Sequence, residues 1–181
     1  MDSENKDLSS EPQSKMALLR TQYPPITVRE CNPRYAQILL ESFAGATSEL
    51  TAITTYLYHH HDSEKLLPEF SSALEDIAIV EMHHLDILAQ LIKLLGGDPR
   101  YHSSNGTLWS PRCIRYLTGD PHSQLIADIH AEAAAITQYR QQIIQICDPH
   151  IQRILERIIQ DEEKHLKTFE KILDKFCKCP R

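Results

Sequence analysis

Two Glu-x-x-His motifs, 81 residues apart, restrict the fold of this chain more than any other feature. They are Glu81-Met-His-His84 and Glu162-Glu-Lys-His165. Residues three apart on an α-helix lie on the same face, so each motif can direct a carboxylate and an imidazole at one ion. A carboxylate that reaches across can bridge two ions, and mixed oxygen and nitrogen ligation suits iron, manganese or zinc. The motifs therefore predict helices that surround a shared metal site.

A second repeat supplies two more carboxylates. The segment from Glu49 to Tyr56 matches the segment from Glu132 to Tyr139 at five positions, which hold Glu, Ala, Ile, Thr and Tyr, and the segments lie 83 residues apart. One glutamate from each of two helices and a Glu-x-x-His from each of two others is a ligand set that holds two metal ions in four-helix bundles. The similar offsets indicate a duplicated helical hairpin, with equivalent ligands around one axis.

Apolar periodicity and helix-end signals predict four helices. Asn32, Asp120 and Asp148 each precede a proline, which is the pattern of an N-cap followed by proline at the first helical position. Gly96 and Gly97 form a helix stop signal. The expected helices span about residues 33–61, 63–95, 121–147 and 149–176.

The connections between these helices predict their arrangement. The links within each pair are short, whereas the segment of about residues 96–120 is long enough to cross the length of a bundle. At about 1.5 Å per residue, the four key glutamates all lie roughly 20 Å from their hairpin turns, near one level. We therefore expect an all-α four-helix bundle of two antiparallel helical hairpins joined by a long crossover. It would cover residues 32–178, after a polar and disordered arm over residues 1–31.

Composition excludes several classes of protein. The formal net charge is −6, and no basic patch indicates a nucleic-acid partner. No apolar run is long enough to span a membrane, and the N-terminus lacks the apolar region of a secretory signal. Five cysteines without an export signal favour reduced thiols and a cytoplasmic location. The sequence leaves the roles of Cys177 and Cys179 open.

Over about residues 33–176 the chain resembles the ferritin-like superfamily of dinuclear-metal carboxylate proteins. Glu81-Met-His-His-Leu-Asp86 is similar to the bacterioferritin Glu-Met-x-His-x-Asp signature, and Asp161-Glu-Glu-Lys-His165 is similar to its second Glu-x-x-His. The segment that begins at Glu49 also resembles the first helix of manganese catalases and their spore-coat relatives. Rubrerythrins share the same ligand arrangement. The resemblance implies a ferritin-like bundle with two iron or two manganese ions per chain.

The chain also departs from these families. Sixteen residues follow His165, so we do not expect the short fifth helix of cage-forming ferritins. A four-cysteine rubredoxin module is absent from the sequence. Met82 stands at the position of the bacterioferritin haem ligand, but we expect it to be a core or interface residue and expect no haem.

We expect six metal ligands and three residues that support them. The expected ligands are Glu49, Glu81, His84, Glu132, Glu162 and His165. Glu81 and Glu162 would bridge the ions, and the terminal pairs would be Glu49 with His84 and Glu132 with His165. Taken singly, each could be a surface residue in a salt bridge, but their coincidence on four helices favours a metal site. Tyr56 and Tyr139 would bond to ligands or act as redox-active phenols near the ions, and Asp128 would orient a ligand histidine.

Some neighbouring residues are expected to take no part. Glu163 is the alternative ligand on the last helix, but its angular position relative to His165 favours Glu162. His83 and His130 lie two residues from a ligand and should point elsewhere. The run of residues 59–61, three histidines, is expected to be a solvated helix end.

The expected function is that of a metal-dependent oxidoreductase. The ion pair would react with peroxide or dioxygen, in a catalase-like, peroxidase-like or ferroxidase-like reaction. Iron storage and a structural role in a spore coat or protein compartment are the alternatives. We expect a homodimer or larger homo-oligomer, with a small-molecule oxidant as its partner. The ligand set does not distinguish iron from manganese.

Overall fold

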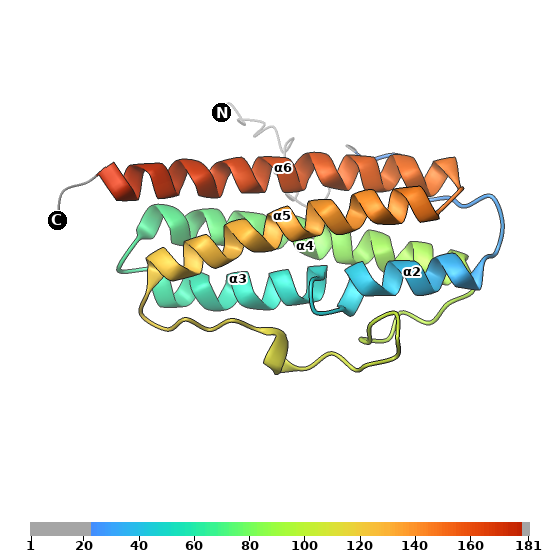
Figure 1. Ribbon diagram of the computed structural model, residues 1–181, viewed down its shortest axis with the longest axis horizontal. Coiled ribbons are helices and arrows are strands. Elements are labelled where there is room, and N and C mark those ends of the chain that lie inside the picture. The colour runs from blue at the N-terminus through green and yellow to red at the C-terminus, as the bar shows by residue number, and fades with distance from the viewer. Residues whose placement is uncertain (1–22, 179–181) are drawn as a thin grey trace, which may run out of the picture.

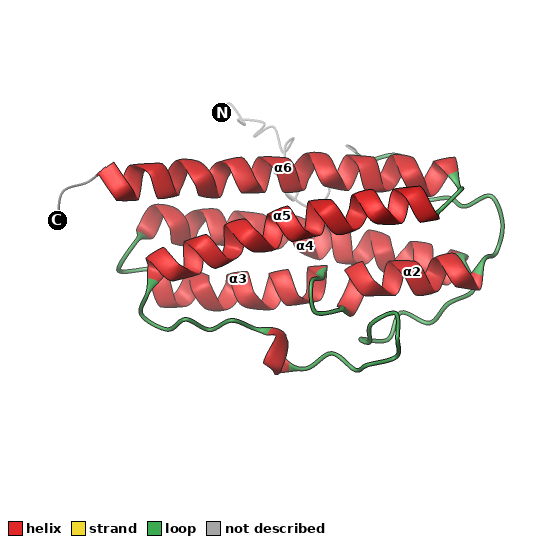
Figure 2. Ribbon diagram, in the orientation of Figure 1, coloured by secondary structure: helices red, strands yellow, loops and turns green. Residues whose placement is uncertain are grey.

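The computed structural model describes residues 23–178, and all of its α-helices lie along one bundle axis (Figure 1). The helices are α2 (Pro33–Ala44), α3 (Glu49–Ser63), α4 (Pro68–Leu94), α5 (Pro121–Gln145) and α6 (Pro149–Lys178), with one short 3₁₀ turn at Pro111–Cys113. Loops and helices account for the described residues, apart from one isolated bridge between His102 and Leu108 (Figure 2). This confirms the expected all-α bundle. None of the helices within residues 23–178 is long and apolar enough to cross a membrane.

The four bundle positions form two hairpins joined by a crossover. α3 packs along α4, and α5 packs along α6. Asn32 and Asp120 cap α2 and α5 through their side chains, as the sequence predicts. Gly96 follows α4 with a positive φ of 84°, a conformation that glycine adopts without steric cost. The crossover then runs along the side of α2 and α3 and reaches the far end of the bundle, where α5 begins (Figure 1).

We expected one continuous helix over residues 33–61 at the first bundle position. The structure has two helices there, α2 and α3. α2 ends at Ala44, and Ser48 starts α3 by accepting a hydrogen bond from the backbone N–H of Thr51. Gly45 lies in the break, where a Cβ atom would come within 2.5 Å of the carbonyl oxygen of Glu41. The break places Glu49 in the first turn of α3.

The apolar core has two parts, on either side of a polar level near the middle of the bundle. The cluster toward α2 contains, among others, Leu39, Phe43, Leu88, Leu91, Ile154 and Ile158. The cluster toward the α3–α4 turn contains Tyr56, Phe70, Leu74, Ile77, Ala78, Leu125, Phe169 and Ile172. These side chains are buried, so each half of the bundle has its own apolar packing.

The segment that precedes α2 packs on the bundle. Ile26 and Val28 contact the core cluster on the α2 side, and the backbone N–H of Arg29 donates to Asp148 at 2.7 Å. The polar composition of residues 1–31 predicts a disordered arm, but these apolar side chains hold residues 23–31 on the bundle. The rest of that arm, residues 1–22, lies outside the described residues.

Substitution of Gly45 by alanine tests the packing of the helix break. The new Cβ would overlap the Glu41 carbonyl, so we expect a loss of about 1–3 kcal/mol in the free energy of unfolding. Urea unfolding followed by circular dichroism measures it. Ala46→Ser, at the exposed neighbouring position, should change stability by less than about 0.5 kcal/mol. Equal effects of the two substitutions would contradict the close packing of Gly45.

Candidate metal centre

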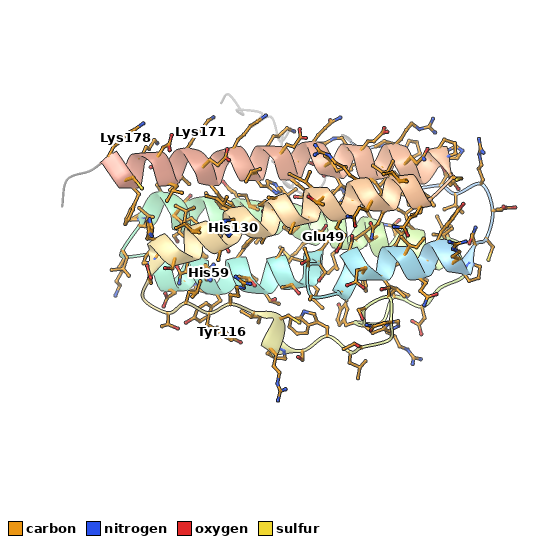
Figure 3. All side chains as sticks on the ribbon, viewed as in Figure 1. Glu49, His59, Tyr116, His130, Lys171 and Lys178 are labelled. Atoms are coloured by element: carbon orange, nitrogen blue, oxygen red, sulfur yellow. The ribbon has the colours of Figure 1, made fainter. Side chains whose placement is uncertain are left out.

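The structure brings all six expected ligand residues together at the polar level between the two core clusters. They come from α3, α4, α5 and α6, and each is buried. Their side chains form two groups, Glu49, Glu81, His84 and Glu162, and Glu81, Glu132, Glu162 and His165. Within each group the ligand atoms lie within 4.8 Å of one another. Glu81 and Glu162 belong to both groups, which are the two positions expected to bridge. Glu49 marks this level near mid-bundle in Figure 3.

His84 turns its Nδ1 atom toward the centre of the first group. Nδ1 lies 2.7 Å from Glu81, 3.2 Å from Glu162 and 3.7 Å from Glu49. Three carboxylates from three helices therefore converge on one imidazole nitrogen.

His165 takes the equivalent place in the second group. Its Nδ1 atom lies 2.9 Å from Glu162, 3.0 Å from Glu81 and 3.8 Å from Glu132. The two groups thus have the same composition and the same order of distances, as expected from a duplicated hairpin with an approximate twofold axis.

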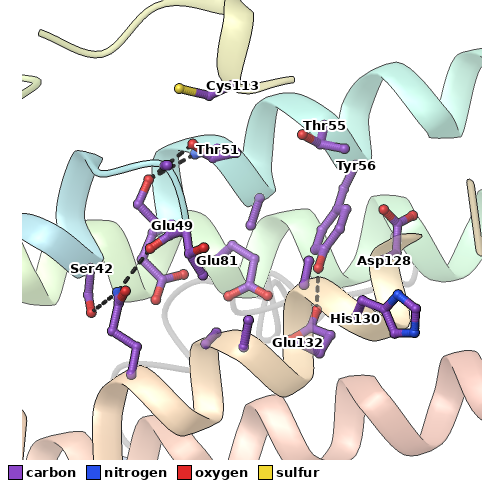
Figure 4. A pocket seen from close by; sticks show the side chains of 18 of the residues that line it. Ser42, Glu49, Thr51, Thr55, Tyr56, Glu81, Cys113, Asp128, His130 and Glu132 are labelled. Atoms are coloured by element: carbon purple, nitrogen blue, oxygen red, sulfur yellow. Dashed lines mark hydrogen bonds between the residues drawn. The ribbon is translucent and has the colours of Figure 1, made fainter. Parts of the chain in front are cut away.

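Two tyrosines bond crosswise to the terminal carboxylates. Tyr56 of α3 donates its hydroxyl to Glu132 of α5 at 2.6 Å (Figure 4), and Tyr139 of α5 donates to Glu49 of α3. Both phenols are almost fully buried, and burial raises the pKa of each well above its ordinary value. Both hydroxyls therefore remain protonated and hold the carboxylates in place.

The proximity of the acidic groups shifts their pKa values in opposite directions. Burial, together with repulsion from Glu81, raises the pKa of Glu132 to about 8. Burial and the charges of Glu81 and Glu162 also raise the pKa of Glu49 well above its ordinary value. At Glu81 burial has the same tendency, but the imidazoles of His165 and His84 outweigh it and lower the pKa.

The imidazoles respond to the same carboxylates. Burial alone would lower the pKa of His84, but the charge of Glu162 raises it well above its ordinary value. At His165 the charge of Glu81 likewise overcomes burial. In the absence of metal, the centre therefore retains protons on its histidines and on some of its carboxylates at neutral pH.

This set of donors fits two divalent metal ions. Four carboxylates would be costly to bury as anions without compensation, and protons only partly neutralise them. Two divalent cations would balance the four negative charges. Both imidazoles could then be neutral, with the Nδ1 lone pair of each free to coordinate an ion. Carboxylate and imidazole ligands suit manganese and iron, and the shared pair of carboxylates suits two ions rather than one.

Asp128 contacts a different histidine from the one we expected. Its carboxylate lies 2.9 Å from Nδ1 of His59, a fully buried side chain, and not beside a ligand imidazole. The other ring nitrogen of His59 donates to the carbonyl oxygen of Arg115 in the crossover, at 2.7 Å. The expectation that the run of residues 59–61 is a solvated helix end is therefore wrong for His59. His61 alone of the three is exposed.

The other neighbours lie outside the two ligand groups. Glu163 forms an ion pair with Arg140 at 3.0 Å on the surface. His83 is buried against the ring of Tyr23, and His130 is exposed. Met82 is also exposed, on the outside of α4.

A cavity of about 510 Å³ leads to the centre between α3 and α5. Glu49, Glu81, Glu132 and Glu162 form its floor, and Asp128 lies on its wall (Figure 4). Small side chains, mostly alanine and threonine, line much of the rest, and the helix break contributes residues 46–48. Crossover residues 112, 113 and 115 also line it. A small molecule can therefore reach the carboxylates from this side.

On the opposite side of the bundle, between α4 and α6, two residues that we did not predict complete the surroundings of the centre. The Tyr23 hydroxyl lies 2.8 Å from Nε2 of His84 and donates to Asp161. Burial raises the pKa of Tyr23 to about 12. Asp161 precedes Glu162 in the second motif, and this position is a possible signal. For Tyr23 the sequence has no signal, because it contacts His84 across 61 residues without any periodic pattern.

Comparison with known protein families places the bundle. Residues 45–179 match the family described as the ferritin-like domain. A probable manganese catalase from Clostridium acetobutylicum is 26% identical over 171 residues, which cover 83% of this chain and 75% of the relative. A bacterioferritin from Desulfovibrio desulfuricans is 31% identical over 145 residues, which cover 77% of this chain and 75% of the relative.

A solved structure shows the same arrangement of helices. The crystal structure of KatB, a manganese catalase from Anabaena, superposes with a TM-score of 0.80 at 30% identity, over 87% of this chain and 80% of the other. The comparisons confirm the resemblance inferred from the two Glu-x-x-His motifs.

The pKa values of the centre predict an unusual pH dependence for the metal-free protein. Glu132, His84 and His165 hold protons in the folded state that the unfolded chain releases at lower pH. The folded state thus binds more protons, so its stability should fall as pH rises from about 6.5 to 8.5. Thermal unfolding of chelator-treated protein measures this. Glu132→Gln, which cannot titrate, should make the fall shallower, and a melting temperature that rises across this range would contradict the prediction.

Proposed function

We propose that this chain, which belongs to the ferritin-like domain family, is a dinuclear manganese or iron oxidoreductase that disproportionates hydrogen peroxide. The observation that carries the proposal is the pair of buried ligand groups that share Glu81 and Glu162. The similarity to manganese catalases supports peroxide as the substrate. The cavity over the four glutamates gives a small oxidant access to the centre.

In this proposal Glu49 and His84 would hold one ion and Glu132 and His165 the other, and both would share Glu81 and Glu162. Bound manganese or iron would supply the reversible electron transfer that lets one peroxide be oxidised to dioxygen and a second be reduced to water. Tyr56 and Tyr139 fix the terminal carboxylates by their hydrogen bonds. The two apolar clusters on either side keep bulk water away from the remaining faces.

The protein also has a group that can hold a proton beside the cavity. Nε2 of His59 donates to a carbonyl oxygen, so this nitrogen carries a hydrogen. The contact between Nδ1 of His59 and Asp128 must then share one further proton, on either the imidazole or the carboxyl. Because Asp128 lines the cavity, this pair is placed to give its shared proton to the departing water and then to take one back from peroxide.

A second candidate function is the oxidation of iron(II) at the same centre. The similarity to bacterioferritin favours it, because the donor set accepts iron as readily as manganese. Particle size, measured by gel filtration, distinguishes the two candidate functions. We expect a cytoplasmic homodimer or small oligomer for a peroxide-consuming enzyme, and a large iron-rich particle for storage.

Oxygen release from hydrogen peroxide tests the main proposal. Metal-free protein is loaded anaerobically with Mn²⁺ or Fe²⁺, and oxygen is followed with an electrode after peroxide is added. We expect catalytic oxygen release with at least one of the two metals. Rapid iron(II) oxidation by dioxygen without oxygen release from peroxide would favour the second candidate. If fully loaded protein catalyses neither reaction, both candidate functions are rejected.

Glu81→Gln tests the ligand assignment. The amide keeps the shape of the side chain but removes the negative charge shared by both groups, so the variant should fail to retain stoichiometric metal after gel filtration. Glu75→Gln, at an exposed position on the same helix, is the matched control and should retain metal like the parent protein. Equal metal content in the two variants would reject Glu81 as a ligand.

Asp128→Asn tests the proton-holding pair. The substitution keeps a hydrogen-bonding side chain beside His59 but removes the group that ionises, so kcat for peroxide should fall by about 10²–10⁴-fold. Metal content should stay unchanged. Asp174→Asn, an exposed substitution on α6, serves as the control. An unaltered kcat in Asp128→Asn would remove this pair from the mechanism.

A further inference from the structure

Tyr23 reaches the candidate centre from outside the bundle and lies against one of its histidines. Its hydroxyl is 2.8 Å from Nε2 of His84, and its ring packs edge-on to His83, with ring centroids 4.8 Å apart. The guanidinium of Arg157 lies over the ring of Tyr23, 4.4 Å from its centroid. The segment of residues 23–31 that carries Tyr23 is fixed by its own apolar contacts with the core.

We infer that Tyr23 is a positioning residue for His84 and that it makes the two metal positions unequal. The ion held by Glu49 and His84 would bind more tightly than the ion held by Glu132 and His165. This inference rests on the proposed dinuclear centre, and it adds a residue that precedes the helical bundle to the surroundings of that centre.

The direction of the hydrogen bonds carries the first step. A phenol has one hydrogen to donate, and Tyr23 donates it to the carboxylate of Asp161. Its oxygen must then accept from His84, so Nε2 of His84 carries the hydrogen. When an ion takes the place of the Nδ1 proton, this bond would hold the imidazole in the tautomer whose Nδ1 lone pair faces the centre. A hydrogen-bond partner of this kind fixes the orientation of a ligand imidazole and strengthens it as a donor.

Two cations hold the far end of this chain of contacts. Arg157 lies 2.5 Å from one oxygen of Asp161, and Lys164 lies 2.9 Å from the other. Asp161 is therefore an anion with its position fixed from both sides. It can accept the Tyr23 hydrogen but has none to give back, so the order from Asp161 through Tyr23 to His84 cannot reverse.

The second histidine lacks an equivalent arrangement in the sequence. Asp161 stands immediately before Glu162 and acts across the bundle on the histidine of the first motif. The corresponding residue before Glu81 is Val80, whose side chain cannot accept a hydrogen bond. The duplicated hairpins thus match in their expected ligands but differ in the residue before each motif, which is Asp161 in one and Val80 in the other.

Stepwise metal titration tests the inference on the full-length protein. Chelator-treated protein is titrated with Co²⁺, and binding is followed by calorimetry and by the visible absorption of the ion, which reports its ligands without any turnover. The parent protein should bind two ions in two resolved steps. Tyr23→Phe should weaken the tighter step by about 10- to 100-fold and alter the spectrum of that ion alone.

Tyr35→Phe is the matched control. Tyr35 packs on the same core cluster, and its hydroxyl contacts the backbone of Cys147, away from the ligand groups. Both binding steps should be unchanged in this variant. If Tyr23→Phe does not fold, Asp161→Asn provides the same test, because a neutral amide no longer anchors the phenol as an anion does. It too should weaken the tighter step.

The outcomes separate this inference from the proposed function. Failure of the parent protein to bind two ions would reject the dinuclear centre itself. Two bound ions with equal affinities, or two steps that Tyr23→Phe leaves unchanged or weakens to the same extent, would reject the positioning role of Tyr23 and leave the centre intact. Selective loss in the tighter step, absent from Tyr35→Phe, would establish it.

Discussion

The burial of four carboxylates and two imidazoles at one level is the interaction on which the rest of the structure depends. Charged groups at this depth are destabilising unless each finds a partner. The protein satisfies them by mutual contacts among the six side chains and by two tyrosines that bond crosswise. The apolar core is consequently divided into two clusters, and the centre joins all four bundle positions at the level between them.

The two sides of the bundle next to the centre are built differently. Between α3 and α5 the helix break at Gly45, the small residues of α5 and the crossover leave a cavity that ends on the carboxylates. Between α4 and α6 the segment of residues 23–31 packs on the core and brings Tyr23 to His84. A small molecule can enter from the first side, whereas on the second side Tyr23 contacts His84. This asymmetry overlies a ligand set that is itself nearly symmetric.

The part of the site that obeys a local pattern could be predicted from sequence, and the part that depends on distant contacts could not. Glu81 and His84 are three residues apart because one helix face must hold both, so the motif reveals them. Gly45 alone does not predict a helix break, since an isolated glycine within a periodic segment is often tolerated. Asp128 shares the face of Glu132, but one turn earlier on the helix its neighbour is His59 and not His84 or His165. Tyr23 meets the centre only through the fold.

Metal content per chain tests the central claim most directly. Untagged protein, purified by gel filtration, would be analysed for all transition metals by elemental analysis and compared with protein reloaded anaerobically. The two ligand groups predict about two manganese or iron ions per chain on a small oligomer. No bound metal, even after anaerobic loading, would mean that the six buried residues stabilise the bundle by their mutual contacts alone, and would contradict the account.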